Sequence, residues 1–228
     1  MKDSPQPMNG MAIFLHPMSP AEIHLAKKCP LMRRLIKTHG PADLEVQMRP
    51  PYEALVTAVS HQQLHGKAAM AILNRFIALF PEVKFPKPAQ LLSCADETLR
   101  ACGFSMSKIL ALRDIAAKTQ SGLVPTKSAA QKLSDEELVQ RLVALRGVGR
   151  WTVEMLLIFT LGRENVFPAD DFGVRAGYRA AMKMEAMPRP KHLLVIAEKW
   201  QPHRTMAAWY LWRAADGAKS VKDPDVRG

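Results

Sequence analysis

The sequence predicts an all-helical fold, and three observations support that prediction. Between residues 69 and 80, apolar residues recur at the spacing of one helix face: Ala69, Ile72, Leu73, Phe76, Ile77 and Phe80. Two capping boxes, Ser19-Pro20-Ala21-Glu22 and Ser134-Asp135-Glu136-Glu137, mark helix starts. No segment shows the period-two alternation that is typical of a half-buried strand.

Glycine, proline and polar clusters divide the rest of the chain into further helices. The run from Val153 to Leu161 is apolar almost all round, so it should form a buried central helix. Residues 1–18 and 217–228 lack a clear period, and we expect loosely ordered ends there. The remaining helices are expected near residues 52–61, 106–119, 151–161, 173–183, 190–199 and 204–215.

Composition favours a polyanionic partner. The 228 residues could form one compact domain or two small lobes. They carry 32 Lys and Arg against 21 Asp and Glu, a formal charge of +11, with a pI near 9.8. Nucleic acid is the first candidate for such a charge. The charge alone fits an ordinary basic protein equally well.

The three cysteines, Cys29, Cys94 and Cys102, show no Cys-x-x-Cys spacing. A disulfide framework or a structural zinc site is therefore disfavoured, and we expect no metal held by side chains. The N-terminus lacks the apolar core of a signal peptide, and no stretch reaches about 18 uninterrupted apolar residues. We expect a soluble protein of a reducing cytoplasm, nucleoid-associated in a bacterium or nuclear in a eukaryote, with no membrane partner.

A glycine-containing turn, Leu145-Arg146-Gly147-Val148-Gly149-Arg150, separates a capped helix (about 134–145) from the buried helix. Glycine permits positive φ and lets another backbone approach closely. The first N–H groups of the second helix lack intrahelical acceptors and lie at the positive end of its dipole, so they could bind a phosphate. Without its flanking residues, a Gly-x-Gly is more often a simple turn between packed helices.

Those flanking residues carry a resemblance. The run from Leu145 to Met155, followed by Phe167-Pro168-Ala169-Asp170-Asp171-Phe172-Gly173-Val174-Arg175, closely resembles the helix-hairpin-helix (HhH-GPD) DNA glycosylase superfamily. Within it, the match is to the alkylpurine branch, the 3-methyladenine DNA glycosylase II type. The similarity extends from about Pro51 to Ala215.

The resemblance implies two helical lobes with a DNA-binding cleft between them, all within residues 19–216. One lobe would comprise about residues 19–60 plus 165–216, and the other about 61–164. Only about 50 residues precede the matched region. We therefore expect the compact form, without the N-terminal β domain of larger relatives.

The resemblance also implies a catalytic carboxylate at Asp171, with Asp170 as the alternative. An Asp at a helix start lies in positive dipole potential, which favours its ionised form, and an anion stabilises a developing sugar cation. An ordinary helix N-cap is the other interpretation. The implied reaction is base-excision repair: a flipped-out alkylated purine, such as 3-methyladenine or 7-methylguanine, is removed by hydrolysis of its N-glycosidic bond. An abasic site remains.

Trp151 stands where lyase relatives carry the lysine that forms a Schiff base, so we expect hydrolysis without strand cleavage. Its ring could stack on an electron-poor alkylated purine, although it could also be a core tryptophan. Met155, one turn later, should line the same base pocket in place of a second aromatic. Other lesions, such as ethenoadenine or hypoxanthine, stay open, as does a non-catalytic DNA-binding module.

DNA contacts are implied on three segments. Gly147, Val148, Gly149, Arg150 and Thr152 of the hairpin would hold the backbone. Between Ser60 and Lys67, Gln63 would fill the gap left by the flipped nucleotide, Gln62 and His65 would lie in the minor groove, and Lys67 would reach a phosphate. Arg204 would touch another phosphate. The nearby aromatic residues Trp209, Tyr210 and Trp212 are expected in the core.

Expectations about cofactors and partners complete this interpretation. Iron–sulfur relatives carry four closely spaced cysteines near the C-terminus, and none follows Cys102, so no cluster is expected. The resemblance leaves room for a monovalent cation at the hairpin carbonyls. The expected partner is double-stranded DNA with alkylated bases, bound by a monomer.

Overall fold

The computed structural model describes residues 18–64 and 66–222, and within these ranges the chain forms helices and no strands. The all-helical prediction is confirmed, and both predicted capping boxes are present. Most of the ends expected to be loosely ordered lie outside the described residues. The α-helices are α1 (Pro20–Lys28), α2 (Pro30–His39), α3 (Pro51–His61), α4 (Gly66–Ala78), α5 (Pro88–Ser93), α6 (Asp96–Ala101), α7 (Met106–Gln120), α8 (Lys127–Ala130), α9 (Asp135–Leu142), α10 (Arg150–Phe159), α11 (Phe172–Ala181), α12 (Pro190–Ala197) and α13 (Arg204–Lys222).

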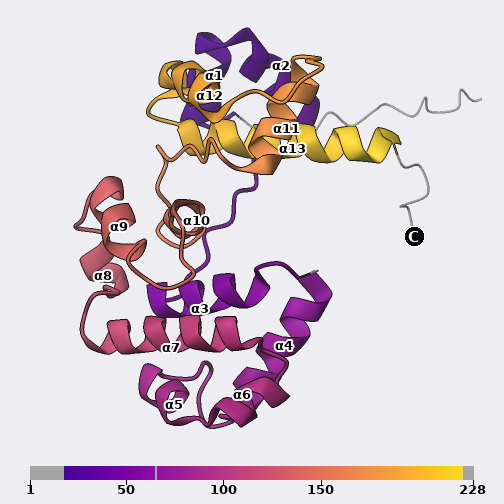
Figure 1. Cartoon of the computed structure of the whole chain (residues 1–228). Coiled ribbons are helices and arrows are strands. Elements are labelled where there is room, and N and C mark those ends of the chain that lie inside the picture. The colour runs from indigo at the N-terminus through magenta and orange to yellow at the C-terminus, as the bar shows by residue number, and fades with distance from the viewer. Residues whose placement is uncertain (1–17, 65, 223–228) are drawn as a thin grey trace, which may run out of the picture.

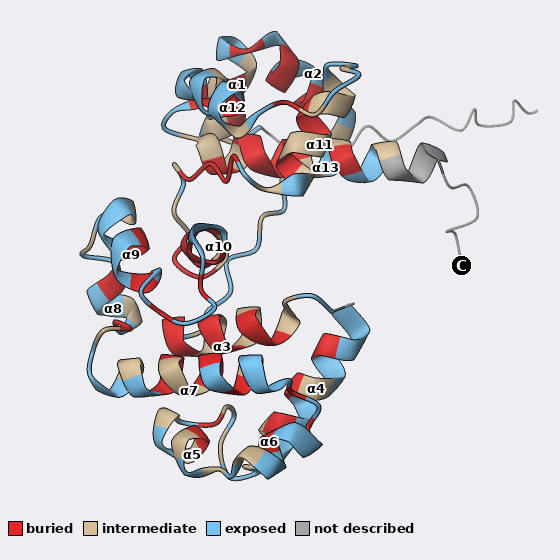
Figure 2. Cartoon of the chain, viewed as in Figure 1, coloured by how far each residue is buried: buried red, intermediate tan, exposed pale blue. Residues whose placement is uncertain are grey.

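The helices form two lobes, each with its own hydrophobic core (Figure 1). The end lobe comprises α1, α2 and α11–α13, and its core includes Leu25, Trp200 and Tyr210. The middle lobe comprises α3–α10, with a core that includes Phe76 and Leu112. Figure 2 shows the buried residues on the inward faces of the helices in both lobes. The middle-lobe helix α10 is the predicted buried helix, and in Figure 1 it lies between the two lobes.

Two predicted boundaries were wrong. We expected residues 51–60 in the end lobe, but α3 belongs to the middle lobe because its apolar face, which includes Leu55 and Val59, packs into that core. The chain crosses between the lobes through residues 40–50, which contain no helix. The last helix continues to Lys222, so the expected tail from residue 217 begins as helix.

A buried carboxylate fixes the start of the crossing segment. Glu22 is 2% exposed, and it accepts hydrogen bonds from the Ala42 N–H at 2.8 Å and the Tyr210 hydroxyl at 2.6 Å. Burial alone would raise the pKa of Glu22, but hydrogen bonds from Tyr210, Ala42 and Ser19 outweigh it and lower the pKa. Helix α13 is thereby tied to α1 two residues before Trp212.

Two glycines let α11 and α13 approach closely. A Cβ on Gly177 would lie 1.7 Å from the carbonyl oxygen of Leu211, which is backbone and cannot move aside. A Cβ on Gly173 would lie 2.8 Å from Cδ1 of Trp212. The missing side chains at these positions allow Trp212 to reach the N-terminus of α11.

Candidate active site and DNA-binding surface

Asp171 is the N-cap of α11, and both of its carboxylate oxygens accept hydrogen bonds. Oδ1 accepts from the backbone N–H of Val174 and from the indole Nε1–H of Trp212, each at 2.7 Å. Oδ2 accepts from the indole Nε1–H of Trp151 at 2.8 Å. Asp170 is exposed and accepts no hydrogen bond from a described residue. The geometry therefore favours Asp171 as the functional carboxylate, with the helix cap as part of its support.

Aromatic rings surround this carboxylate. The edge of Trp151 points to Asp171 while 45% of the residue stays exposed, so part of its ring surface is open to a ligand. Trp212 stacks on Phe159, with ring centroids 5.7 Å apart and planes 25° from parallel. We expected Trp212 in the core, and it does pack against both hydrophobic cores. Its neighbours Trp209 and Tyr210 are buried as predicted, but Trp212 is half-buried and turned toward the N-cap of α11.

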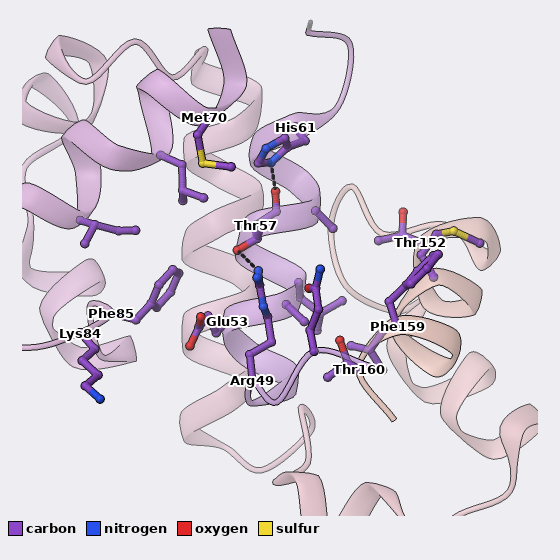
Figure 3. Close-up of a pocket in the computed structure, with 18 of the residues that line it drawn as sticks. Arg49, Glu53, Thr57, His61, Met70, Lys84, Phe85, Thr152, Phe159 and Thr160 are labelled. Atoms are coloured by element: carbon purple, nitrogen blue, oxygen red, sulfur yellow. Dashed lines mark hydrogen bonds between the residues drawn. The ribbon is translucent and has the colours of Figure 1, made fainter. Parts of the chain in front are cut away.

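The middle lobe contains a cavity of about 470 Å³ (Figure 3). Phe159 connects it to the Asp171 arrangement, because Phe159 lines the cavity and stacks on Trp212. Met155 and Phe159 of α10 line one side, so the base-pocket residue Met155 does face a cavity. Helices α3 and α4 and the crossing segment line the rest, with Arg49 and His61 among the polar side chains. The crossing segment is fixed there by the Gln47 N–H, which donates to the carbonyl of Phe159 at 2.6 Å.

Between Gly147 and Gly149, the hairpin exposes backbone groups and no polar side chain. Gly147 has a φ of 74°, as predicted for this turn, whereas Gly149 has an extended φ of −95° and open space where a Cβ would lie. Val148 and Thr152 are buried, so any DNA contact by either residue must use its backbone. Gly149 is the N-cap of α10 and has no side chain to cap it, which leaves the first N–H groups of the helix available to an anion.

The contacts of Arg150 argue against its predicted role as a contact to the DNA backbone. Its guanidinium pairs with Glu136 of α9 at 2.9 Å and with Glu154 of α10 at 3.2 Å, so it ties the two helices of the motif together. Burial raises the pKa of Glu154 to about 7, even though Arg150 acts in the opposite direction.

The segment expected to open DNA links α3 to α4. Gln63 is exposed and has a φ of 57°, a conformation that is uncommon for residues other than glycine and that recurs at functional sites. The Gln62 side chain donates from Nε2 to the carbonyl of Gly147 at 3.0 Å, which joins this segment to the hairpin. Lys67 is exposed in the first turn of α4. His65 lies outside the described residues.

Arg204, predicted as a phosphate contact, is engaged within the protein. Its Nε donates to Asn165 Oδ1 at 2.9 Å, and its Nη2 donates to the Asn165 carbonyl at 3.0 Å. Its geometry favours a structural role at the start of α13. Among the described residues, no group of three or more His, Cys, Asp or Glu is arranged to hold a metal ion. No described helix is long and apolar enough to span a membrane.

Comparison with known proteins agrees with this site. Residues 56–203 match the family described as "HhH-GPD superfamily base excision DNA repair protein". The chain belongs to the HhH-GPD superfamily. It is 46% identical over 210 residues to DNA-3-methyladenine glycosylase 1 of Schizosaccharomyces pombe, covering 90% of this chain and 92% of the relative. It is 35% identical over 195 residues to alkylbase DNA glycosidase-like protein mag2 of the same organism, covering 85% and 92%.

Solved structures extend the agreement to three dimensions. The S. pombe 3-methyladenine DNA glycosylase, solved in complex with abasic DNA, superposes with a TM-score of 0.78 at 47% identity, covering 86% of this chain and 96% of that one. A DNA-3-methyladenine glycosidase from Bacillus halodurans gives a TM-score of 0.78 at 30% identity, covering 89% and 92%. The family resemblance predicted from the hairpin and the Asp170-Asp171 segment is confirmed.

Sequence reasoning missed two aromatic members of this HhH-GPD site. Phe159 lies two turns beyond Trp151 on the same face of α10, so the spacing of residues 151, 155 and 159 could have identified it. Trp212 is separated from Asp171 by 41 residues, and no local pattern distinguishes it from its buried neighbours.

Proposed function

We propose that this protein is a base-excision DNA glycosylase that removes alkylated purines such as 3-methyladenine and 7-methylguanine, leaving an abasic site. The observation that supports it most is the carboxylate of Asp171, which two indoles and a helix N-terminus hold in place. One of these indoles, Trp212, stacks on Phe159, and Phe159 lines the neighbouring cavity. Membership of a base-excision repair family and similarity to named 3-methyladenine glycosylases agree with that chemistry.

Asp171 acts mainly through its charge. An alkylated purine is already a cationic leaving group, so its departure needs little acid catalysis. As the bond between the base nitrogen and C1′ breaks, its electron pair stays with the base and positive charge develops on the sugar. The fixed carboxylate stabilises that charge and orients a water that attacks C1′, after which the water's proton is released. Because the surrounding donors already hold Asp171 in place, little reorganisation is needed during the reaction.

Trp151 and the residues behind it receive the flipped base. The exposed ring surface of Trp151 offers a π face for a cationic purine, and Met155 and Phe159 extend the apolar wall into the cavity. An indole has no amine that could form an imine with the sugar, so the enzyme hydrolyses the bond without cleaving the strand.

The hairpin and the α3–α4 segment bind the DNA around the flipped nucleotide. The free N–H groups at the start of α10 hold one phosphate, and Lys67 holds another. Gln63 fills the gap in the duplex, with His65 in the minor groove. The carbonyls of Ala144 and Gly147 accept hydrogen bonds from Lys118 and Gln62, and each oxygen keeps a second lone pair with which it could bind a monovalent cation at the hairpin.

The test is release of bases from methylated duplex DNA. We expect the wild-type chain to release 3-methyladenine and 7-methylguanine, and Asp171→Asn to lose at least about a hundredfold in single-turnover rate, as when other preorganised charge-stabilising groups are removed. Binding of Asp171→Asn to a duplex with an abasic-site analogue should persist, and Asp170→Asn should retain activity. Undiminished release by Asp171→Asn would exclude the mechanism. No release by the wild type, with equal binding to intact and abasic duplexes, would favour a non-catalytic DNA-binding module.

A further inference from the structure

The hairpin is held from outside its own motif by α7 of the middle lobe. Asp114 Oδ2 accepts a hydrogen bond from the backbone N–H of Arg146 at 2.7 Å. Lys118, one turn later on α7, pairs with the same carboxylate oxygen at 2.9 Å and also donates to the carbonyl of Ala144 at 2.7 Å. The ion pair between Asp114 and Lys118 therefore binds two backbone groups of the turn, the N–H of Arg146 and the carbonyl of Ala144.

The next residue of the turn, Gly147, lies close to α7 and is held by one further hydrogen bond. A Cβ on Gly147 would lie 3.3 Å from Cβ of Ala111, which stands on α7 three residues before Asp114. The carbonyl of Gly147 accepts from Gln62 in the segment between α3 and α4. From Ala144 to Gly147, the turn is thus fixed by side chains that belong neither to α9 nor to α10.

A turn that contains two glycines has more backbone freedom than a turn without glycine, and ordering it during DNA binding would reduce affinity. We propose that Asp114, held by Lys118, is a positioning residue that presets the hairpin for the DNA backbone. This inference rests on the proposed role of the hairpin in binding DNA. The first N–H groups of α10 begin only four residues beyond Arg146, so a shift of the turn displaces them directly.

The negative charge of Asp114 allows a positioning role to be distinguished from a direct electrostatic effect on DNA binding. A carboxylate beside a phosphate-binding turn repels DNA, and the neighbouring ammonium of Lys118 offsets that repulsion. Removing Asp114 makes the surface more positive, which by electrostatics alone strengthens DNA binding. A positioning role has the opposite consequence, because the turn loses its anchor.

The experiment measures the affinity of full-length variants for a duplex with an abasic-site analogue. We expect Asp114→Ala to bind about tenfold more weakly than wild type, the effect of losing one hydrogen bond to a charged group. Its single-turnover excision rate at saturating enzyme should change less than about twofold on the same reasoning. Asp114→Asn keeps an acceptor for the Arg146 N–H, so it should recover most of the lost affinity.

Asp96→Ala is the matched control. Asp96 pairs with Arg113, the residue of α7 that precedes Asp114, and its removal also deletes one negative charge from the middle lobe. It should bind DNA at least as tightly as wild type, and thermal unfolding of each variant confirms that the assay is run on folded protein. Unchanged or tighter binding by Asp114→Ala, or an equal loss in Asp96→Ala, would overturn the inference. Failure of wild type to bind the abasic duplex would instead overturn the proposed function.

Discussion

The indole N–H of Trp212 donates to Oδ1 of Asp171 at 2.7 Å, although 41 residues of chain separate the two. The indole of Trp151 donates to the other oxygen at 2.8 Å. Hydrogen bonds to an ionised acceptor are about twice as strong as neutral ones, so the two indoles fix the orientation of the carboxylate. The position of the Asp171 carboxylate therefore depends on three helices, α10, α11 and α13, because each of them contributes one hydrogen-bond donor.

Trp212→Phe should reduce excision while leaving DNA affinity unchanged. Phenylalanine can keep the stack on Phe159 but cannot donate to Asp171. Because a hydrogen bond to a charged group contributes about 1.5–3 kcal/mol, we expect a loss of about tenfold to a hundredfold in the single-turnover rate. Trp209→Phe on the same helix serves as the control, with a wild-type rate. Full activity in Trp212→Phe would show that this donor is dispensable.

Substitutions of the two glycines of α11 should have different effects on stability and on excision. Gly177→Ala places a methyl group against the Leu211 backbone, and we expect it to lower the free energy of unfolding by more than about 3 kcal/mol. Gly173→Ala meets the movable Trp212 ring, so it should cost less stability but reduce excision. Gly217→Ala, in open space on α13, should be neutral or stabilising. Denaturant unfolding and single-turnover assays of the three variants make the comparison. Equal stability of Gly177→Ala and Gly217→Ala would contradict it.

Stability should depend on pH through Glu154. Burial raises the pKa of this carboxyl from 4.5 to about 7, so the folded chain binds the proton more tightly than the unfolded chain. Its contribution to stability is therefore fully present below about pH 4.5 and is lost as the pH rises through 7. Glu154→Gln removes the titration. Relative to this variant, wild type should lose about 2–3 kcal/mol between pH 5 and pH 8 in urea unfolding. A constant difference across that range would refute the prediction.

Lys67 and Arg150 should respond differently to substitution. Lys67 is exposed and pairs with no acidic side chain among the described residues, so it is available to a phosphate. Lys67→Ala should reduce the slope of log affinity against log salt by about one. Arg150→Ala should leave that slope nearly unchanged but destabilise the fold, because it leaves Glu154 buried without its partner. A reduced slope in Arg150→Ala would restore the predicted contact with the DNA backbone.

Sequence patterns predicted the long helices, both capping boxes and the central position of α10, because a full amphipathic period or a capping box is a local signal. They did not predict α5, α6 and α8, which have only six, six and four residues and so show little periodicity. They also did not predict α2, which begins at Pro30, two residues after α1 ends. Helix α3 was assigned to the wrong lobe because its apolar face does not reveal which core it joins. In the site, Asp171 and Trp151 follow from motifs, whereas Trp212 depends on the close approach of α11 and α13.

The two indoles that hold Asp171 come from different lobes: Trp151 from the middle lobe and Trp212 from the end lobe. Neither half of the molecule can therefore assemble the reactive centre by itself. A chain whose lobes are not packed together would lose the hydrogen bond from Trp151 to Asp171, whereas Trp212 and Asp171 would stay together in the end lobe.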